Sequence, residues 1–225
     1  MYRILFIDEE SDAFNAFRDY FEESSLNDQI AVLTEFPLSN LNDMIELIIK
    51  LNPDAVISDF MLNEMKTEIK YNVPYSGVEL LKEFLEVREG FPCFILTSFD
   101  DDAIHTSDDV NIVYVKGILQ GEEVERNVKA SFVDRVISQI NHYRYRIFEA
   151  EKELIRLIDL RNSGEVLTVQ DENEIIRLDH FLECSIDKRN SIPEDLKKVT
   201  NSIKFEALIS KVDELIDKFK SKDGK

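Results

Sequence analysis

Residues 55–62 read AVISDFML, a compact apolar run that ends at Asp59. Four more apolar runs of strand length lie before and after it: Tyr2–Ile7, Ile30–Thr34, Cys93–Leu96 and Ile112–Val115. A short apolar run bounded by turn residues is typical of a strand that is covered on both faces. Together with Ala55–Ser58, these runs predict five fully buried strands.

The segments between the predicted strands have the apolar spacing of helices. Their apolar side chains are Phe14, Phe17 and Phe21, then Leu41, Ile45, Ile48 and Ile49, then Val78, Leu81 and Leu85. Alternation of strand and helix predicts an α/β fold, in which helices cover both faces of a parallel sheet. The acidic stretch Phe99–Asn111 predicts only a short or irregular fourth helix, and Phe60–Ser76 predicts a long loop.

The pattern after Gly121 is helical only. From Val136 to Leu157 the apolar residues alternate steps of four and three, which predicts a seam along one long helix. This seam could form a coiled coil with a second chain, or it could be buried against later helices of the same chain. We therefore predict two domains: an α/β domain over residues 1–120, and an all-α region with a long helix over residues 121–225.

Charge and composition exclude several classes of protein. Residues 1–120 hold 24 acidic and 8 basic side chains, and residues 121–225 hold 22 and 19. Neither half has the surplus of Lys and Arg that nucleic-acid binding requires. We expect no membrane span and no secretory signal, and hence a cytoplasmic protein, because no apolar run is long enough for either. Cys93 and Cys184 are too far apart in sequence to indicate a zinc site.

Polar side chains follow four of the five predicted strands. They are Asp8 and Glu9 after the first strand, Asp59 after the third, Thr97 after the fourth and Lys116 after the fifth. The carboxyl ends of parallel strands meet at one edge of the sheet, where ligands of such folds bind. Three carboxylates at that edge would repel one another unless a cation lay among them. Oxygen ligands favour Mg²⁺, whose remaining positions are filled by waters and a phosphate oxygen.

Five fragments, in their order along the chain, resemble the receiver domains of two-component response regulators, the CheY-like family. These fragments are ILFIDEES, AVISDFML, YSGVELL, FILTS and VYVKG, within residues 1 to about 120. The resemblance implies a flavodoxin-like, five-stranded parallel sheet in the order 2-1-3-4-5. It implies that Asp59 accepts a phosphoryl group, and that Thr97 and Lys116 bind the phosphoryl oxygens. It also implies that Mg²⁺ is held by Asp8, Glu9, Asp59 and the main-chain carbonyl of Met61.

The function that this resemblance implies is a phosphorelay switch. A histidine kinase is the expected phosphodonor, and the expected chemistry is limited to the protein's own phosphorylation and dephosphorylation. The helical region would then bind an unknown downstream protein or form a homodimer through the long helix.

The sequence also departs from the family pattern. Glu9 replaces the usual aspartate, Val113 the usual aromatic residue and Gly117 the usual proline. These departures leave open a second hypothesis, a pseudo-receiver that acts as a scaffold without phosphorylation. A DNA-binding regulator ranks lowest, because residues 121–225 show no basic face and no helix-turn-helix pattern.

Overall fold

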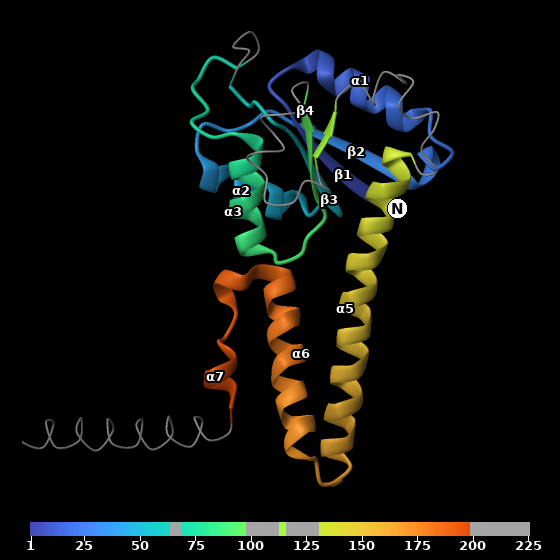
Figure 1. Ribbon diagram of the computed structural model, residues 1–225, viewed down its shortest axis with the longest axis vertical. Coiled ribbons are helices and arrows are strands. Elements are labelled where there is room, and N and C mark those ends of the chain that lie inside the picture. Colours follow the sequence, from blue (N-terminus) through green and yellow to red (C-terminus); the bar gives the residue numbers. More distant parts are fainter. Residues whose placement is uncertain (64–68, 98–112, 116–130, 199–225) are drawn as a thin grey trace, which may run out of the picture. The chain divides into compact units, whose positions relative to one another are not determined.

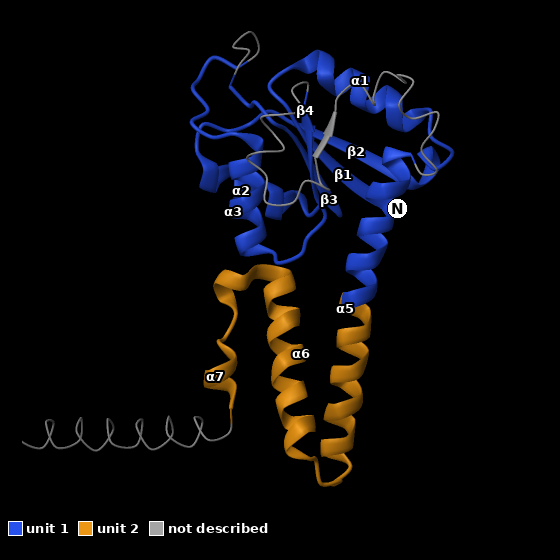
Figure 2. Cartoon of the chain, viewed as in Figure 1, with its two compact units in different colours: residues 1–146 blue, residues 147–225 orange. Residues whose placement is uncertain are grey.

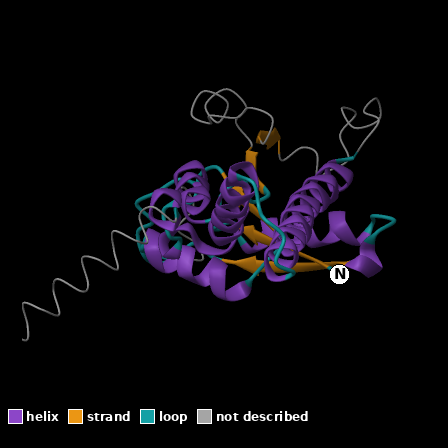
Figure 3. Cartoon of the chain, turned by 90° about the horizontal axis from the view of Figure 1, so that it is seen from below, coloured by secondary structure: helices purple, strands orange, loops and turns teal. Residues whose placement is uncertain are grey.

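The computed structural model describes residues 1–63, 69–97, 113–115 and 131–198 of the 225-residue chain. The chain forms two compact units, unit 1 over residues 1–146 and unit 2 over residues 147–225 (Figure 2). Unit 1 is α/β, whereas the described part of unit 2 contains only helices and loops (Figure 3). Across the described residues, no helix is both long enough and apolar enough to cross a membrane.

A parallel sheet with the strand order β2-β1-β3-β4-β5 lies at the centre of unit 1. The strands are β1 (Tyr2–Ile7), β2 (Ile30–Glu35), β3 (Ala55–Asp59), β4 (Cys93–Thr97) and β5 (Val113–Val115). Four strands of five or six residues form the body of the sheet, and the three-residue β5 completes one edge. This order is the flavodoxin-like one, so the predicted flavodoxin-like α/β fold is confirmed.

Burial along the strands depends on their place in the sheet. Every residue of β3 and β4 is buried, as is β1 from Ile4 onward, because helices cover both faces of these strands. The prediction of five fully buried strands is wrong for β2, in which all six residues are only partly buried. β2 has a neighbour on one side only, so solvent reaches it.

The helices in the described part of unit 1 are α1 (Ser11–Glu22), α2 (Leu41–Leu51), α3 (Gly77–Val87) and the first part of α5 (Phe132–Asn162), with a short 3-10 turn η1 (Asn27–Gln29). Figure 1 shows α2 and α3 on one side of the sheet and α1 on the other. Asn40 caps α2 by accepting the amides of Asn42 and Asp43. Residues 98–112, for which we predicted a short fourth helix, lie outside the described residues.

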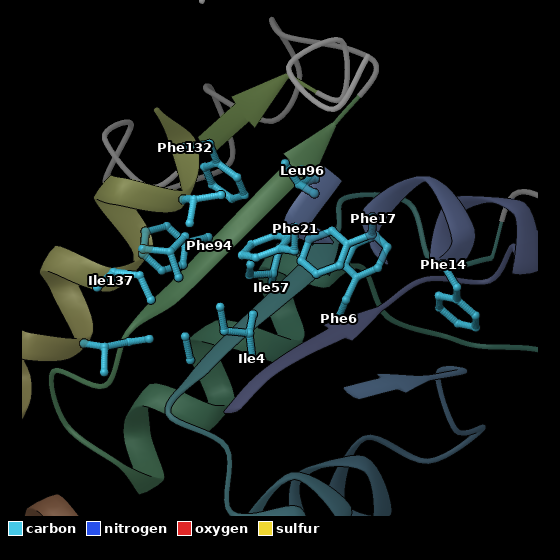
Figure 4. Packing of buried hydrophobic residues seen from close by; sticks show 14 residues of the cluster. Ile4, Phe6, Phe14, Phe17, Phe21, Ile57, Phe94, Leu96, Phe132 and Ile137 are labelled. Carbon is cyan, nitrogen blue, oxygen red and sulfur yellow. The ribbon is translucent and has the colours of Figure 1, made fainter. Parts of the chain in front are cut away.

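The core on the α1 face of the sheet is rich in phenylalanine (Figure 4). Phe6 of β1 stacks on Phe17 of α1, with ring centroids 4.3 Å apart and an interplanar angle of 12°. Phe94 of β4 meets Phe132 of α5 edge to face at 6.0 Å. Burying one such side chain stabilises the fold by about 1.5–3 kcal/mol, so these rings fix α1 and α5 against the sheet.

The first turns of α5 belong to unit 1. Phe132, Val136 and Ile140 are buried in the same core as the strands. Asn141 accepts a hydrogen bond from the Tyr2 hydroxyl at 3.0 Å, further along α5. Unit 1 therefore extends to residue 146, well beyond residue 120, where we placed the domain boundary; residue 120 itself lies outside the described residues.

Unit 2 is built around a helical hairpin. It contains the rest of α5, then α6 (Val169–Asp187), the turn η5 (Lys188–Asn190) and the short helix α7 (Glu194–Lys197). Ala150 and Leu157 of α5 are buried in a cluster with Leu178 of α6. In unit 2, the seam predicted along the long helix is therefore buried against a later helix of the same chain, one of the two alternatives that the sequence left open.

Candidate functional site

The register of the sheet brings three predicted site residues to neighbouring strand ends. Ile7 pairs with Ser58, so Asp8 and Asp59 are the next residues on the adjacent strands β1 and β3. Asp59 pairs with Leu96, and Thr97 follows Leu96 at the end of β4. Adjacent strands lie about 4.8 Å apart. Asp8, Asp59 and Thr97 thus lie together at the carboxyl edge of the sheet, as the sequence predicted.

All three side chains are removed from solvent. Asp8 is 0% exposed, Thr97 is 1% exposed and Asp59 is 6% exposed. Glu9, which follows Asp8, is 4% exposed. Acidic residues are seldom buried to this degree unless they are bound by other groups. The burial of these carboxylates therefore sets them apart from the solvated acidic side chains of an ordinary surface.

Main-chain amides orient two of the carboxylates. The amide of Glu10 donates to Asp8 Oδ1 at 3.0 Å, and the amide of Met61 donates to Asp59 Oδ2 at 2.9 Å. In both cases the donor lies two residues after the aspartate, the arrangement of an Asx turn. These bonds turn the chain sharply where the strand ends, which keeps each carboxylate at the sheet edge.

Gly77, the first residue of α3, packs directly on the main chain at Asp59. Its amide donates to the Phe60 carbonyl at 2.9 Å. A Cβ atom on Gly77 would lie 1.9 Å from the Asp59 carbonyl oxygen and 2.6 Å from Ser58 Oγ. Only glycine therefore allows this approach. Sequence reasoning missed this role, although a glycine at the first position of a predicted helix was an available signal.

The start of α3 is held in place by a capping box. Ser76 Oγ accepts the Glu79 amide at 3.2 Å, and Glu79 Oε2 accepts the Ser76 amide at 2.7 Å. This reciprocal pair satisfies two amides that a helix start leaves without partners. The capping box and the Gly77 contact together fix α3 next to the Asp59 main chain.

The last part of the long loop before α3 is hydrogen-bonded to the loop between β2 and α2. The Tyr75 hydroxyl donates to the Leu38 carbonyl at 2.5 Å, and the Tyr71 hydroxyl donates to the Pro37 carbonyl at 2.8 Å. Tyr75 is 5% exposed, and this burial is the main cause that raises its pKa above the ordinary value of 10.0. The hydroxyl therefore stays protonated, and remains a donor, at a pH where an ordinary tyrosine begins to ionise. The sequence predicted this loop but not these two bonds.

The donor chemistry of the site fits magnesium. Asp8, Glu9 and Asp59 offer only oxygen atoms, which are the ligands that Mg²⁺ prefers. However, in the described ranges no group of three or more His, Cys, Asp and Glu side chains is arranged so that it could hold a metal ion. Mg²⁺ often uses only one or two carboxylates, with waters and phosphate oxygens in the other positions. The oxygen donors are thus of the kind that Mg²⁺ uses, and the binding of this ion stays a prediction.

The predicted roles of the Met61 carbonyl and of Lys116 are not tested by the structure. Met61 reaches Asp59 through its amide, and the role of its carbonyl as a metal ligand stays a prediction. Lys116 lies outside the described residues. The strand before it ends at Val115, which pairs with Thr97. The role of Lys116 also stays a prediction.

Comparison with known proteins gives only distant similarities. No family model matches the chain, and no curated protein matches it. It is similar to the anti-anti-sigma factor PhyR from Bartonella quintana, with a TM-score of 0.43 and 14% identity over 66% of this chain and 51% of PhyR. The chain thus spans about half the length of PhyR.

The response regulator RcsB is similar to the chain in more than one structure. RcsB from Salmonella typhimurium gives a TM-score of 0.37 and 15% identity, over 81% of this chain and 66% of RcsB. RcsB from Salmonella enterica serovar Typhimurium, bound to promoter P1flhDC with the phosphomimetic BeF3⁻, gives 0.39 and 15%, over 87% of this chain and 95% of RcsB. The strand order, and not these similarities, carries the fold assignment.

Proposed function

We propose that the chain is a response regulator whose unit 1 accepts a phosphoryl group on Asp59 from a histidine kinase. The observation that carries the proposal is the placement of Asp8, Asp59 and Thr97 at adjacent strand ends of a flavodoxin-like sheet, all buried. In open parallel sheets, ligands bind at this edge. The resemblance of the fragments around these residues to receiver domains supports the same function.

The chemistry begins with the Asp59 carboxylate, which the Met61 amide orients. One of its oxygens attacks the phosphorus atom of a phosphohistidine, and the P–N bond breaks with its electron pair going to the imidazole ring. When bound, Mg²⁺ would supply positive charge that offsets the charge of the phosphoryl group. Its protein ligands would be Asp8, Glu9, Asp59 and the Met61 carbonyl. The Thr97 hydroxyl and the Lys116 ammonium group bind phosphoryl oxygens of the resulting aspartyl phosphate.

Strand β4 joins the site to the start of α5 within unit 1. Thr97 ends β4, and Phe94 of the same strand lies against Phe132 in the first turn of α5. A closely packed core transmits small displacements, because its side chains cannot move independently. Movement of Thr97 toward a phosphoryl group would therefore bias the start of α5, which makes that helix the proposed output.

The proposal is tested by adding beryllofluoride, a phosphoryl analogue, with Mg²⁺ and measuring thermal unfolding. The expected result is a higher melting temperature, because a ligand that binds only the folded state stabilises it. Asp59→Asn should abolish the shift. Asp19→Asn, which changes an exposed carboxylate on α1, should keep it. A wild-type protein that does not respond would contradict phosphoryl acceptance.

A second candidate function is a pseudo-receiver that acts as a scaffold without phosphorylation. It is favoured by the lack of a three-ligand metal group within the described part of the chain, and by Glu9 and Gly117, which depart from the receiver pattern. A scaffold would keep one assembly state and one melting temperature with and without the analogue. Light scattering alongside the thermal measurement therefore separates the two functions.

A further inference from the structure

Side chains of unit 2 line a groove beside the first half of α6. Its volume is about 340 Å³. Three isoleucines line the groove together with charged side chains of both signs; the lining includes Ile175, Ile176, Ile192, Arg161, Glu172 and Lys197. A groove that combines apolar and charged side chains fits an amphipathic helix, whose apolar face lies in the groove while its polar face stays in water.

The chain that forms one side of this groove is fixed to α6. The Ile192 amide donates to Glu183 Oε2 at 2.8 Å, and the Ile192 carbonyl accepts from His180 Nδ1 at 3.2 Å. Lys197, further along the same chain, pairs with Glu183 and with Asp179. While its main chain is held in this way, Ile192 remains 51% exposed. The groove is therefore preformed, and an occupant does not have to order its walls.

The core of unit 2 continues to the groove. Ile175 lines the groove and also packs against the buried cluster around Leu157 and Leu178. Within the described part of unit 2, the hydrophobic side chains packed around that cluster are only partly buried; they are Leu154, Leu160, Ile175, Phe181 and Leu182. A pair of helices buries one face of each, and helical domains close their core with further helices. Unit 2 therefore fits another helix beside α6.

The sequence that follows the described residues of unit 2 has the spacing of such a helix. Residues 199–225 follow Lys198, and their apolar residues recur every three or four positions: Phe205, Leu208, Ile209, Val212, Leu215, Ile216 and Phe219. On a helix with 3.6 residues per turn these positions fall within an arc of about 120°. An apolar arc of this width is typical of an amphipathic helix that packs against other helices.

We propose that residues 205–219 form a helix whose apolar face binds in this groove of the same chain. The described chain ends at Lys198, one residue after Lys197, which lines the groove. When extended, residues 199–204 span about 20 Å. The lining residues of α6 extend over about 10 Å of that helix. The connection is therefore long enough for the proposed helix to reach any part of the groove.

The tether favours this segment over the same segment of a second copy. A segment joined to its site by a short connection has an effective concentration in the millimolar range. A second copy at micromolar concentration competes poorly with it. The contact needs no phosphoryl group, so it stands or falls independently of the proposed function.

Hydrogen exchange of the full-length chain tests the proposal. A helix of about 15 residues is marginal in water on its own, so slow exchange of the amides of residues 205–219 indicates that the helix is docked. Val212→Glu on the segment and Ile176→Glu in the groove should each speed this exchange by about tenfold or more, because each places a charge in the apolar contact.

Each of these variants has a control that adds the same charge elsewhere. Ser210→Glu changes a position about 200° from Val212 around the proposed helix, on its polar face. Ile186→Glu changes a residue of α6 that is 69% exposed and lies outside the lining of the groove. In both controls, residues 205–219 should exchange as slowly as in the wild type.

Sedimentation velocity of the same samples distinguishes the chain's own segment from that of a second copy. The expected result is slow exchange in a monomer. Exchange of residues 205–219 at the rate of an unfolded peptide overturns the proposal, as does slow exchange that neither Val212→Glu nor Ile176→Glu affects. Slow exchange that develops only as the chain dimerises also overturns it, because the segment then binds in the groove of the second copy.

Discussion

The carbonyl oxygen of Asp59 occupies the space that a side chain on Gly77 would need, 1.9 Å from the position of its Cβ atom. The first turn of α3 is therefore built on the main chain of the proposed phosphoacceptor. A change at either residue should displace the other, because the contact is between backbone atoms that cannot rotate away.

Gly77→Ala should destabilise the protein by about 1–3 kcal/mol, because the added methyl group forces the strand end and the helix start apart. It should also reduce phosphoryl acceptance by displacing Asp59. Urea unfolding and a phosphorylation assay measure the two effects. Gly164→Ala is the matched control: Gly164 has a φ of +84° with nothing near its Cβ position, so only conformational strain of about 1 kcal/mol is expected. A Gly77→Ala protein with unchanged stability would refute the contact.

Tyr75→Phe should cost about 1 kcal/mol of folding free energy, because the buried hydroxyl that donates to the Leu38 carbonyl is lost. Tyr71→Phe should cost less, since Tyr71 is 40% exposed and water can replace its bond to Pro37. Chemical denaturation of both variants gives the comparison. A larger loss for Tyr71→Phe than for Tyr75→Phe would show that the two bonds are ranked wrongly.

Burial raises the pKa of the Cys93 thiol above its ordinary value of 9.0. The folded state therefore keeps its proton where the unfolded chain loses it. The resulting stability is fully present below pH 9 and falls as the pH rises further. Between pH 7 and pH 10, the free energy of unfolding of the wild type should fall by about 1.4 kcal/mol more than that of Cys93→Ala. Equal losses, measured by urea unfolding at both pH values, would mean that the thiol is not protected.

Lys197 of α7 forms ion pairs with two carboxylates of α6. Its side chain is 10% exposed and binds Asp179 and, at 2.8 Å, Glu183. Burial lowers its pKa, but the hydrogen bonds with these two carboxylates outweigh burial and raise it overall. Lys197→Met should cost about 1–3 kcal/mol, because it leaves two carboxylates without their cation.

Hydrogen exchange of the amides of residues 192–198 measures this effect directly. Faster exchange is expected in Lys197→Met. Lys198→Met is the matched control, since Lys198 pairs at the surface with the exposed Asp195 and should contribute little. Similar exchange in both variants would show that Lys197 is not the residue that holds α7.

The apolar runs of the sequence located the strands closely. β1 has the predicted bounds, and β3 and β4 are each one residue longer than predicted, ending at Asp59 and Thr97. The extra residues are polar, so a pattern of apolar residues stops before them although their main chains still pair. The sequence did not predict the partial burial of β2. This burial depends on the order of the strands in the sheet, and a local pattern of apolar residues carries no information about that order.

The missed features of the site depend on contacts between distant parts of the chain. Gly77 meets Asp59, and Tyr75 binds Leu38, across 18 and 37 positions respectively. No local signal specifies such partners. The seam of α5 shows the same limit: its spacing predicted an apolar face, but only tertiary structure shows that Leu157 packs with Leu178 of α6. By contrast, the carboxylates at the strand ends were predictable, because parallel strands must bring their carboxyl ends to one edge.

Phosphoryl acceptance by Asp59 is tested most directly by intact-mass spectrometry after incubation with acetyl phosphate and Mg²⁺. We predict that the wild-type chain gains the mass of one phosphoryl group, that the gain is labile in base as an acyl phosphate should be, and that Asp59→Asn gains nothing. An unchanged wild-type mass, or an equal gain in the Asp59→Asn variant, would contradict this account.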